Sequence, residues 1–139
     1  MTKQKNLRSI VRRLAKNWAV PVGCGLVFLF LLRFVFFFGY VPSASMEPAI
    51  KEGSFILGVR LVGELKLGDV VVFEHEGFLL TKRIAALPGD SVVIDGEAVP
   101  VPDDCYFMLG DNDDVSLDSR CWDDPFVKRS SIIALLPFR

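Results

Sequence analysis

The first strongly patterned part of the chain is one long apolar run over residues 18–41, in which Arg33 is the single charged residue. As a helix, this run would be about 36 Å long, enough to cross a bilayer hydrocarbon core of about 30 Å. Trp18 and Tyr40 lie near its two ends, where amphipathic rings favour the membrane interface. The pattern therefore predicts a transmembrane anchor over residues 18–41.

Arg33 is the residue that fits this span least well, because a charge at the bilayer centre costs at least about 2.5 kcal/mol. Arg33 stands eight positions before Val41, so its side chain could snorkel to the outer headgroups. Alternatively, the span ends near Leu32 and residues 34–38 lie in the interface. A cleaved signal peptide ending at the small residues 43–45, or a buried core helix, is also open. The run exceeds the roughly 7–15 residues of a signal core, which favours a retained anchor.

Beyond Pro42 the hydrophobic pattern changes to short alternating or β-branched runs separated by turn residues. Two of these runs are joined by Asp95-Gly96, a pair that favours the positive φ angles of a tight hairpin. Helical periodicity over ten residues is absent from the sequence after Tyr40. We expect strands at 54–61, 69–74, 78–86, 91–94, 97–101, 105–109 and 131–136. The predicted fold is mainly β: an N-terminal transmembrane helix, then a small, mostly antiparallel β domain over residues 42–139, as a bent sheet or partly closed barrel.

The charge distribution divides the chain at the same place. Residues 1–41 carry seven basic residues and no acidic one, whereas residues 42–139 carry nine basic and 17 acidic residues, a formal charge of −8. By the positive-inside rule, the basic segment 1–17 is expected in the cytoplasm and the β domain outside it. An acidic domain disfavours a nucleic-acid partner, and a 51% hydrophobic composition disfavours disorder.

Candidate chemistry begins with a serine-containing segment at 42–48, which by composition could be only a loop leaving the membrane. A serine nucleophile needs an adjacent base. The single histidine, His75, lies between two glutamates in an expected turn, which disfavours a Ser–His–Asp triad. Burial can neutralise a lysine, and Lys82 lies in an apolar run, although Lys82-Arg83 could simply be solvated or pair with acidic residues. Lys51 and Lys66 stand beside a glutamate or a turn glycine, which keeps a lysine charged.

Four sequence blocks add weight to these candidates because of their order. They are P-S-x-S-M-x-P at 42–48, GDVVVF at 68–73, KRIAALPGD at 82–90, and GDN at 110–112 with SLDSR at 116–120. This series resembles the bacterial type I signal peptidase family, the membrane-anchored Ser/Lys serine proteases. The resemblance covers roughly residues 30–122.

The resemblance implies a hydrolase in which Ser45 is the nucleophile and Lys82 the general base. The backbone N–H of Ser45 and the hydroxyl of Ser43 would stabilise the oxyanion. The remaining implied roles are a hydrogen bond to the lysine amine from Ser116, a loop-bracing salt bridge between Asp118 and Arg120, and a wall of the substrate pocket formed by Met46. It implies no metal and no cofactor.

The resemblance also implies partners and location. The substrates would be exported preproteins with signal peptides, cleaved after small residues and bound at a sheet edge, and the enzyme would reside in the lipid bilayer of the plasma (inner) membrane. It would cross once, with its N-terminus in the cytoplasm. The compact chain is also similar to peptidases that mature pilin subunits in conjugative transfer, so a dedicated substrate is open. A catalytically silent, membrane-anchored peptide-binding module is the alternative from another class.

Two further features are an acidic residue where the family pattern has a basic one, and a pair of cysteines in the β domain. Asp113 follows the GDN block where a basic residue is usual, and Asp113-Asp114 would raise the pKa of Lys82 if the carboxylates were close. Cys105 and Cys121 flank the last block, and a disulfide between them is permitted outside the cytoplasm but not required. The sequence contains no Cys/His cluster with metal-ligand spacing.

Overall fold

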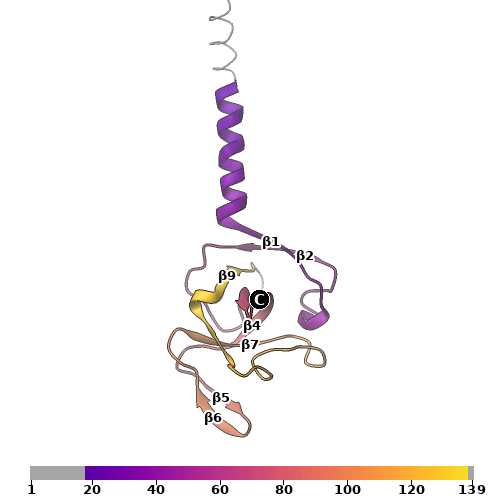
Figure 1. Cartoon of the computed structure of the whole chain (residues 1–139), viewed down its shortest axis with the longest axis vertical. Helices are drawn as coiled ribbons and strands as arrows, with labels where there is room; N and C mark the ends of the chain where they lie inside the picture. The colour runs from indigo at the N-terminus through magenta and orange to yellow at the C-terminus, as the bar shows by residue number, and fades with distance from the viewer. Residues whose placement is uncertain (1–17, 138–139) are drawn as a thin grey trace, which may run out of the picture. The chain divides into compact units, whose positions relative to one another are not determined.

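The computed structural model describes residues 18–137, which divide into a helical unit ending at Val35 and a β unit beginning at Phe36 (Figure 1). The helix runs from Trp18 to Val35, with a mean hydropathy of 2.0 and no buried residue. Its last turn, η1 (Leu31–Val35), is π-helical. At 18 residues it is about 27 Å long, so it is long and apolar enough to cross a membrane. The expected cytoplasmic segment, residues 1–17, lies outside the described residues.

The helix ends earlier than the sequence pattern predicted. Residues 36–40 form strand β1 (Phe36–Tyr40), which pairs with β2 (Phe55–Val59). The prediction of one helix to Val41 was therefore wrong over these residues, and the end at Val35 is nearer to the alternative end at Leu32. Phe37 is buried while Phe38 and Tyr40 are exposed, an alternation that suits a strand in contact with a core.

The β unit contains one seven-stranded antiparallel sheet with the strand order β1-β2-β9-β3-β4-β7-β8, and a separate hairpin of β5 and β6. This confirms the predicted mainly β, antiparallel fold. The remaining strands are β3 (Val70–His75), β4 (Phe78–Ala86), β5 (Ser91–Ile94), β6 (Glu97–Pro100), β7 (Cys105–Leu109), β8 (Phe126–Lys128) and β9 (Ile132–Leu135). The described part of the unit, residues 36–137, also contains the short 3-10 helices η2 (Ala44–Met46) and η3 (Arg129–Ser131).

Most strand boundaries lie within two residues of those expected. The predicted hairpin is confirmed, because Asp95 and Gly96 have φ angles of 52° and 86° and join β5 to β6. Strand β8 was not predicted. It has three residues, too few for an alternating pattern to be recognised, and its pairing with β7 defines it.

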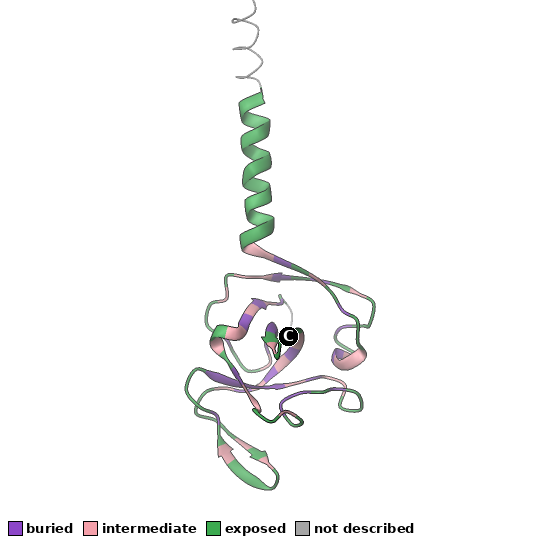
Figure 2. Cartoon of the chain, in the orientation of Figure 1, coloured by how far each residue is buried: buried purple, intermediate pink, exposed green. Residues whose placement is uncertain are grey.

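Strand β3 is the centre of the core, which explains its continuous apolar sequence. Val70 and Val72 pack into one buried cluster, whereas Val71 and Phe73 point to the opposite face and pack into a second. Figure 2 shows that the buried residues belong to the β unit, whereas the helix is exposed along its length. A strand covered on both faces carries apolar residues without alternation. Lys82 of β4 is the register partner of Val71, so a lysine is placed directly opposite a fully buried valine.

The paired strands β1 and β2 leave an aromatic surface uncovered. Phe38, Tyr40, Phe55 and Leu57 are all exposed, and the register sets Phe38 opposite Leu57 and Tyr40 opposite Phe55. The Phe55 ring lies 5.4 Å from the Phe38 ring and 5.5 Å from the Tyr40 ring, measured between centroids. We refer to these four residues as the β1–β2 aromatic face.

Candidate active site

The serine segment, residues 42–48, follows β1, and Met46 within it packs into the core and anchors it. Ser45 lies in η2, and the next residue, Met46, is 1% exposed and packs in the first core cluster. The backbone N–H of Ile50 donates to the Met46 carbonyl at 2.8 Å, which closes the turn. The hydroxyl oxygens of Ser43 and Ser45 are 3.3 Å apart. The segment therefore presents two serine hydroxyls together, and a role for Met46 in a substrate pocket stays a prediction.

Asn112, which is distant in the sequence, binds this segment through two hydrogen bonds. Its backbone N–H donates to the Ser45 carbonyl at 3.1 Å, and its side-chain Nδ2 donates to the Ala44 carbonyl, also at 3.1 Å. Sequence reasoning did not single out Asn112 as a site residue. Its position in the GDN block was the available signal, but the partner lies 68 positions away in the sequence.

Lys82 supplies a buried amine. The residue is 3% exposed, and its Nζ donates to the Ser116 hydroxyl at 2.8 Å. Burial lowers the pKa of Lys82 below its ordinary value of 10.5, because an apolar environment disfavours the charged form. The carboxylate of Asp118 opposes this shift, the guanidinium of Arg120 adds to it, and Asp111 opposes it more weakly. A lysine in this environment is deprotonated more readily than one in water.

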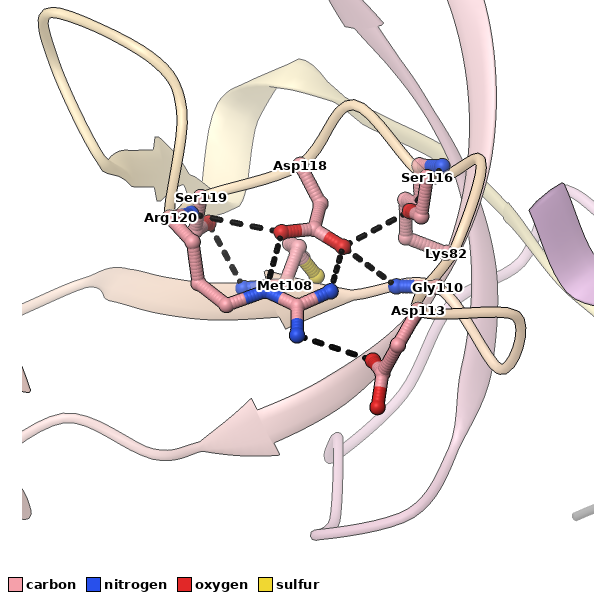
Figure 3. Close-up of polar contacts among 8 residues, drawn as sticks. All are labelled: Lys82, Met108, Gly110, Asp113, Ser116, Asp118, Ser119 and Arg120. Atoms are coloured by element: carbon pink, nitrogen blue, oxygen red, sulfur yellow. Dashed lines mark hydrogen bonds and ion pairs between the residues drawn. The ribbon is translucent and has the colours of Figure 1, made fainter.

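Asp118 organises the loop beside Lys82 through several polar contacts (Figure 3). The residue is fully buried. Its Oδ2 accepts hydrogen bonds from the Ser116 hydroxyl at 2.7 Å and from the Gly110 backbone N–H at 3.0 Å. Arg120 donates through Nε to Oδ1 at 2.9 Å and through Nη2 to Oδ2 at 2.8 Å. Burial alone would raise the pKa of Asp118, but the hydrogen bonds from Arg120, Gly110 and Ser116 outweigh it and hold that pKa well below its ordinary value.

These contacts fix the direction of the Ser116 hydroxyl. Its proton is donated to Asp118, so the oxygen presents a lone pair to Lys82. The same loop is attached to β7 by Ser119, whose hydroxyl accepts from the Met108 backbone N–H at 2.9 Å and whose own N–H donates back at 3.1 Å. The amine of Lys82 is therefore held by a chain of contacts that begins in the core of the sheet.

A second ion pair attaches the GDN segment to β4. Arg83 donates through Nε and Nη2 to the two carboxylate oxygens of Asp111 at 2.7 and 2.6 Å, and through Nη1 to the Gly68 carbonyl at 2.8 Å. The hydrogen bonds to Asp111 raise the pKa of Arg83. Of the two expectations for Lys82-Arg83, solvation is wrong for the buried lysine, and pairing with an acid is confirmed for the arginine. The Arg83–Asp111 pair was not among the predicted site residues.

Gly110 is the point at which the serine segment and the lysine-holding loop come together. A Cβ on Gly110 would overlap the Ser116 hydroxyl oxygen and would lie 2.5 Å from the Ser45 carbonyl oxygen. Both groups therefore border the same small volume next to the Gly110 Cα. Only glycine permits this approach.

The condition under which Asp113 would raise the pKa of Lys82 was a short distance between the two side chains, and Asp113 is not among the groups that shift that pKa. The carboxylates that raise the pKa of Lys82 are those of Asp118 and Asp111. Asp113 instead accepts a hydrogen bond from Arg120 Nη1 at 2.8 Å. The sequence could not distinguish these outcomes, because they depend on which cation the side chain meets.

The other candidates for chemistry are His75 and the cysteines. The His75 ring stacks on Trp122 with 4.0 Å between centroids. All three cysteines lie in the described range and are free: Cys105 is buried, Cys24 and Cys121 are exposed, and the permitted Cys105–Cys121 disulfide is not formed. Between residues 18 and 137, no group of three or more His, Cys, Asp or Glu side chains could hold a metal ion.

Comparison with known proteins gives a consistent result. A family model described as signal peptidase, peptidase S26, matches residues 15–100 and 93–139. Signal peptidase I of Bacillus amyloliquefaciens is 31% identical to the chain, with 75% of the chain and 76% of the relative covered. Signal peptidase I S of Bacillus subtilis (strain 168) is 30% identical, covering 75% and 77%. Probable signal peptidase I-1 of Synechocystis sp. is 31% identical, covering 82% and 76%. The chain belongs to the signal peptidase I family of S26 peptidases.

Proposed function

We propose that this chain is a membrane-bound serine endopeptidase that removes N-terminal signal peptides from exported preproteins with a Ser45/Lys82 dyad. The observation that carries the proposal is the state of Lys82: a buried amine with a lowered pKa, held at 2.8 Å from the Ser116 hydroxyl. A lysine serves as a general base only when a substantial fraction is neutral near the working pH. Family membership supports the same chemistry.

In the first half of the reaction, neutral Lys82 Nζ accepts the Ser45 hydroxyl proton while Ser45 Oγ bonds to the scissile carbonyl carbon. The carbonyl oxygen becomes an oxyanion, stabilised by the Ser45 backbone N–H and the Ser43 hydroxyl. The C–N bond then breaks, and the Lys82 ammonium returns its proton to the leaving amine. An ester between the substrate acyl group and Ser45 remains.

In the second half, Lys82 accepts a proton from a water molecule whose oxygen attacks the ester carbonyl. The bond to Ser45 Oγ breaks, Ser45 recovers its proton from Lys82, and the carboxylic acid product leaves. Ser116 and Asp118 take no proton in either half. They hold the lysine amine so that its lone pair stays available to Ser45 and to water.

The membrane setting has support of two kinds. The helix Trp18–Val35 is long and apolar enough to span a bilayer, and the basic residues before it favour a single crossing with a cytoplasmic N-terminus. The β1–β2 aromatic face begins directly after this helix. Phe38 is only three residues beyond Val35 in the sequence. Exposed aromatic side chains at that distance suit the interfacial region of the membrane.

The test uses the full chain reconstituted in lipid vesicles with a preprotein whose signal peptide ends in small residues. We expect cleavage by the wild type, and a loss of about a thousand-fold or more in Ser45→Ala and in Lys82→Ala. Ser91→Ala and Lys66→Ala are matched controls at exposed positions and should retain activity. Full activity in either dyad variant would refute the assignment.

Two further outcomes separate the alternatives. Cleavage of one preprotein among several unrelated ones would indicate a substrate-dedicated maturation peptidase with the same dyad. An inactive wild type whose Ser45 does not react with a serine-directed acylating probe would indicate a silent peptide-binding module. Broad cleavage of preproteins supports the general signal peptidase.

A further inference from the structure

Asp113 makes a contact that the catalytic steps above do not use. Its Oδ1 accepts a hydrogen bond from Arg120 Nη1 at 2.8 Å, while Nε and Nη2 of the same guanidinium donate to Asp118 (Figure 3). One guanidinium thus joins two carboxylates of very different environment. Asp118 is fully buried, whereas the Asp113 side chain is 76% exposed.

Asp113 belongs to the segment that holds the nucleophile. It follows directly after Asn112, whose backbone N–H and Nδ2 donate to the carbonyls of Ser45 and Ala44. A restraint on the Asp113 side chain is therefore one residue away from the groups that fix the Ser45 backbone.

Asp118 belongs to the segment that holds the base. It accepts the Ser116 proton, and Ser116 in turn accepts from Lys82 Nζ. Arg120 pairs with the carboxylates of Asp113 and Asp118, and so connects the GDN segment to the loop that binds Lys82. The contacts form a continuous path from the nucleophile segment, through the guanidinium, to the amine of the base.

We propose that Asp113 is a positioning residue, which through Arg120 keeps the segment that carries Ser45 aligned with the loop that aims Lys82. The inference rests on the proposed function of the site. Because the Asp113–Arg120 pair is exposed, its contribution is small and is screened by salt. The Asp113–Arg120 pair should affect kcat, the turnover of bound substrate, rather than KM. Neither residue needs to touch the peptide for this role.

The experiment measures kcat and KM for a short soluble peptide with a signal-type cleavage site, using the full chain in detergent micelles. Asp113→Asn removes the carboxylate charge, Asp113→Glu preserves it, and Asp114→Asn removes the same charge at the next position, which is exposed. Each protein is assayed at about 20 mM and about 1 M salt, where screening lengths are roughly 20 and 3 Å. Thermal unfolding verifies that each variant is folded.

At low salt we expect Asp113→Asn to lower kcat by about two- to fivefold with KM unchanged, the range an exposed ion pair supports. Asp113→Glu should recover most of this loss, and Asp114→Asn should match the wild type. At high salt the wild type should fall toward Asp113→Asn. Equal kcat in Asp113→Asn and Asp114→Asn, a loss confined to KM, or a deficit that salt does not change would each overturn the inference while leaving the proposed function intact. An inactive wild type would overturn both.

Discussion

Replacing Gly110 by alanine tests whether the close approach of the two halves of the site governs activity. The new Cβ would lie 2.5 Å from the Ser45 carbonyl oxygen and would overlap the Ser116 hydroxyl. The hydroxyl belongs to a side chain that could rotate, although rotation would break its contacts to Lys82 and Asp118. The Ser45 oxygen belongs to the backbone and has no such freedom.

The displacement follows from these distances. Ordinary van der Waals contact for a Cβ begins at 3.4 Å, so Gly110 and Ser45 must separate by about 0.9 Å. A misplacement of about 1 Å at reacting groups can reduce a rate by about a hundredfold. Overpacking of a buried site also costs about 1–3 kcal/mol in the free energy of unfolding. We therefore expect a folded protein with a lowered melting temperature and a kcat reduced by about two orders of magnitude.

The assay compares kcat on a soluble peptide for wild type, Gly110→Ala and Gly63→Ala, together with thermal unfolding of each. Gly63 is the matched control, because a Cβ there meets no atom within 4 Å, and Gly63→Ala should behave as wild type. If Gly110→Ala kept its kcat within about threefold of wild type, the argument that this approach aligns Ser45 with Lys82 would be wrong.

Three further predictions concern pH, the oxyanion and the membrane. The rise of kcat/KM with pH should have its midpoint below 10.5, because burial lowers the pKa of Lys82 and only the neutral amine accepts a proton. Asp118→Asn should move this midpoint to lower pH, since the Asp118 carboxylate raises that pKa; a shift to higher pH would contradict the electrostatic account. Ser43→Ala should lower kcat by about 10²- to 10³-fold with little change in KM, and a change in KM alone would exclude Ser43 as an oxyanion donor. Phe38→Ser combined with Phe55→Ser should reduce cleavage of a preprotein embedded in vesicles but leave cleavage of a soluble peptide unchanged, and equal losses on both substrates would argue against interfacial binding.

The sequence alone predicted the features that depend on local pattern. A long apolar run, alternating strands and turn pairs such as Asp95-Gly96 are readable because hydrophobic period and backbone preference act over a few residues. The four ordered blocks also indicated the positions of Ser45 and Lys82. The same local logic failed at residues 36–40, where an apolar stretch suits a helix or a strand equally and pairing with β2 decides between them.

Only the tertiary structure decided how these residues act on one another. Lys82 is a buried amine because β3 sets Val71 opposite it and because Ser116, 34 positions away, meets its Nζ. Asn112 holds a carbonyl 68 positions away. Asp113, whose effect on the lysine depended on how close its carboxylate would lie, is bound to Arg120. Burial and ion pairing are properties of neighbours in space, and those neighbours are fixed by the packing of the whole sheet rather than by any one segment.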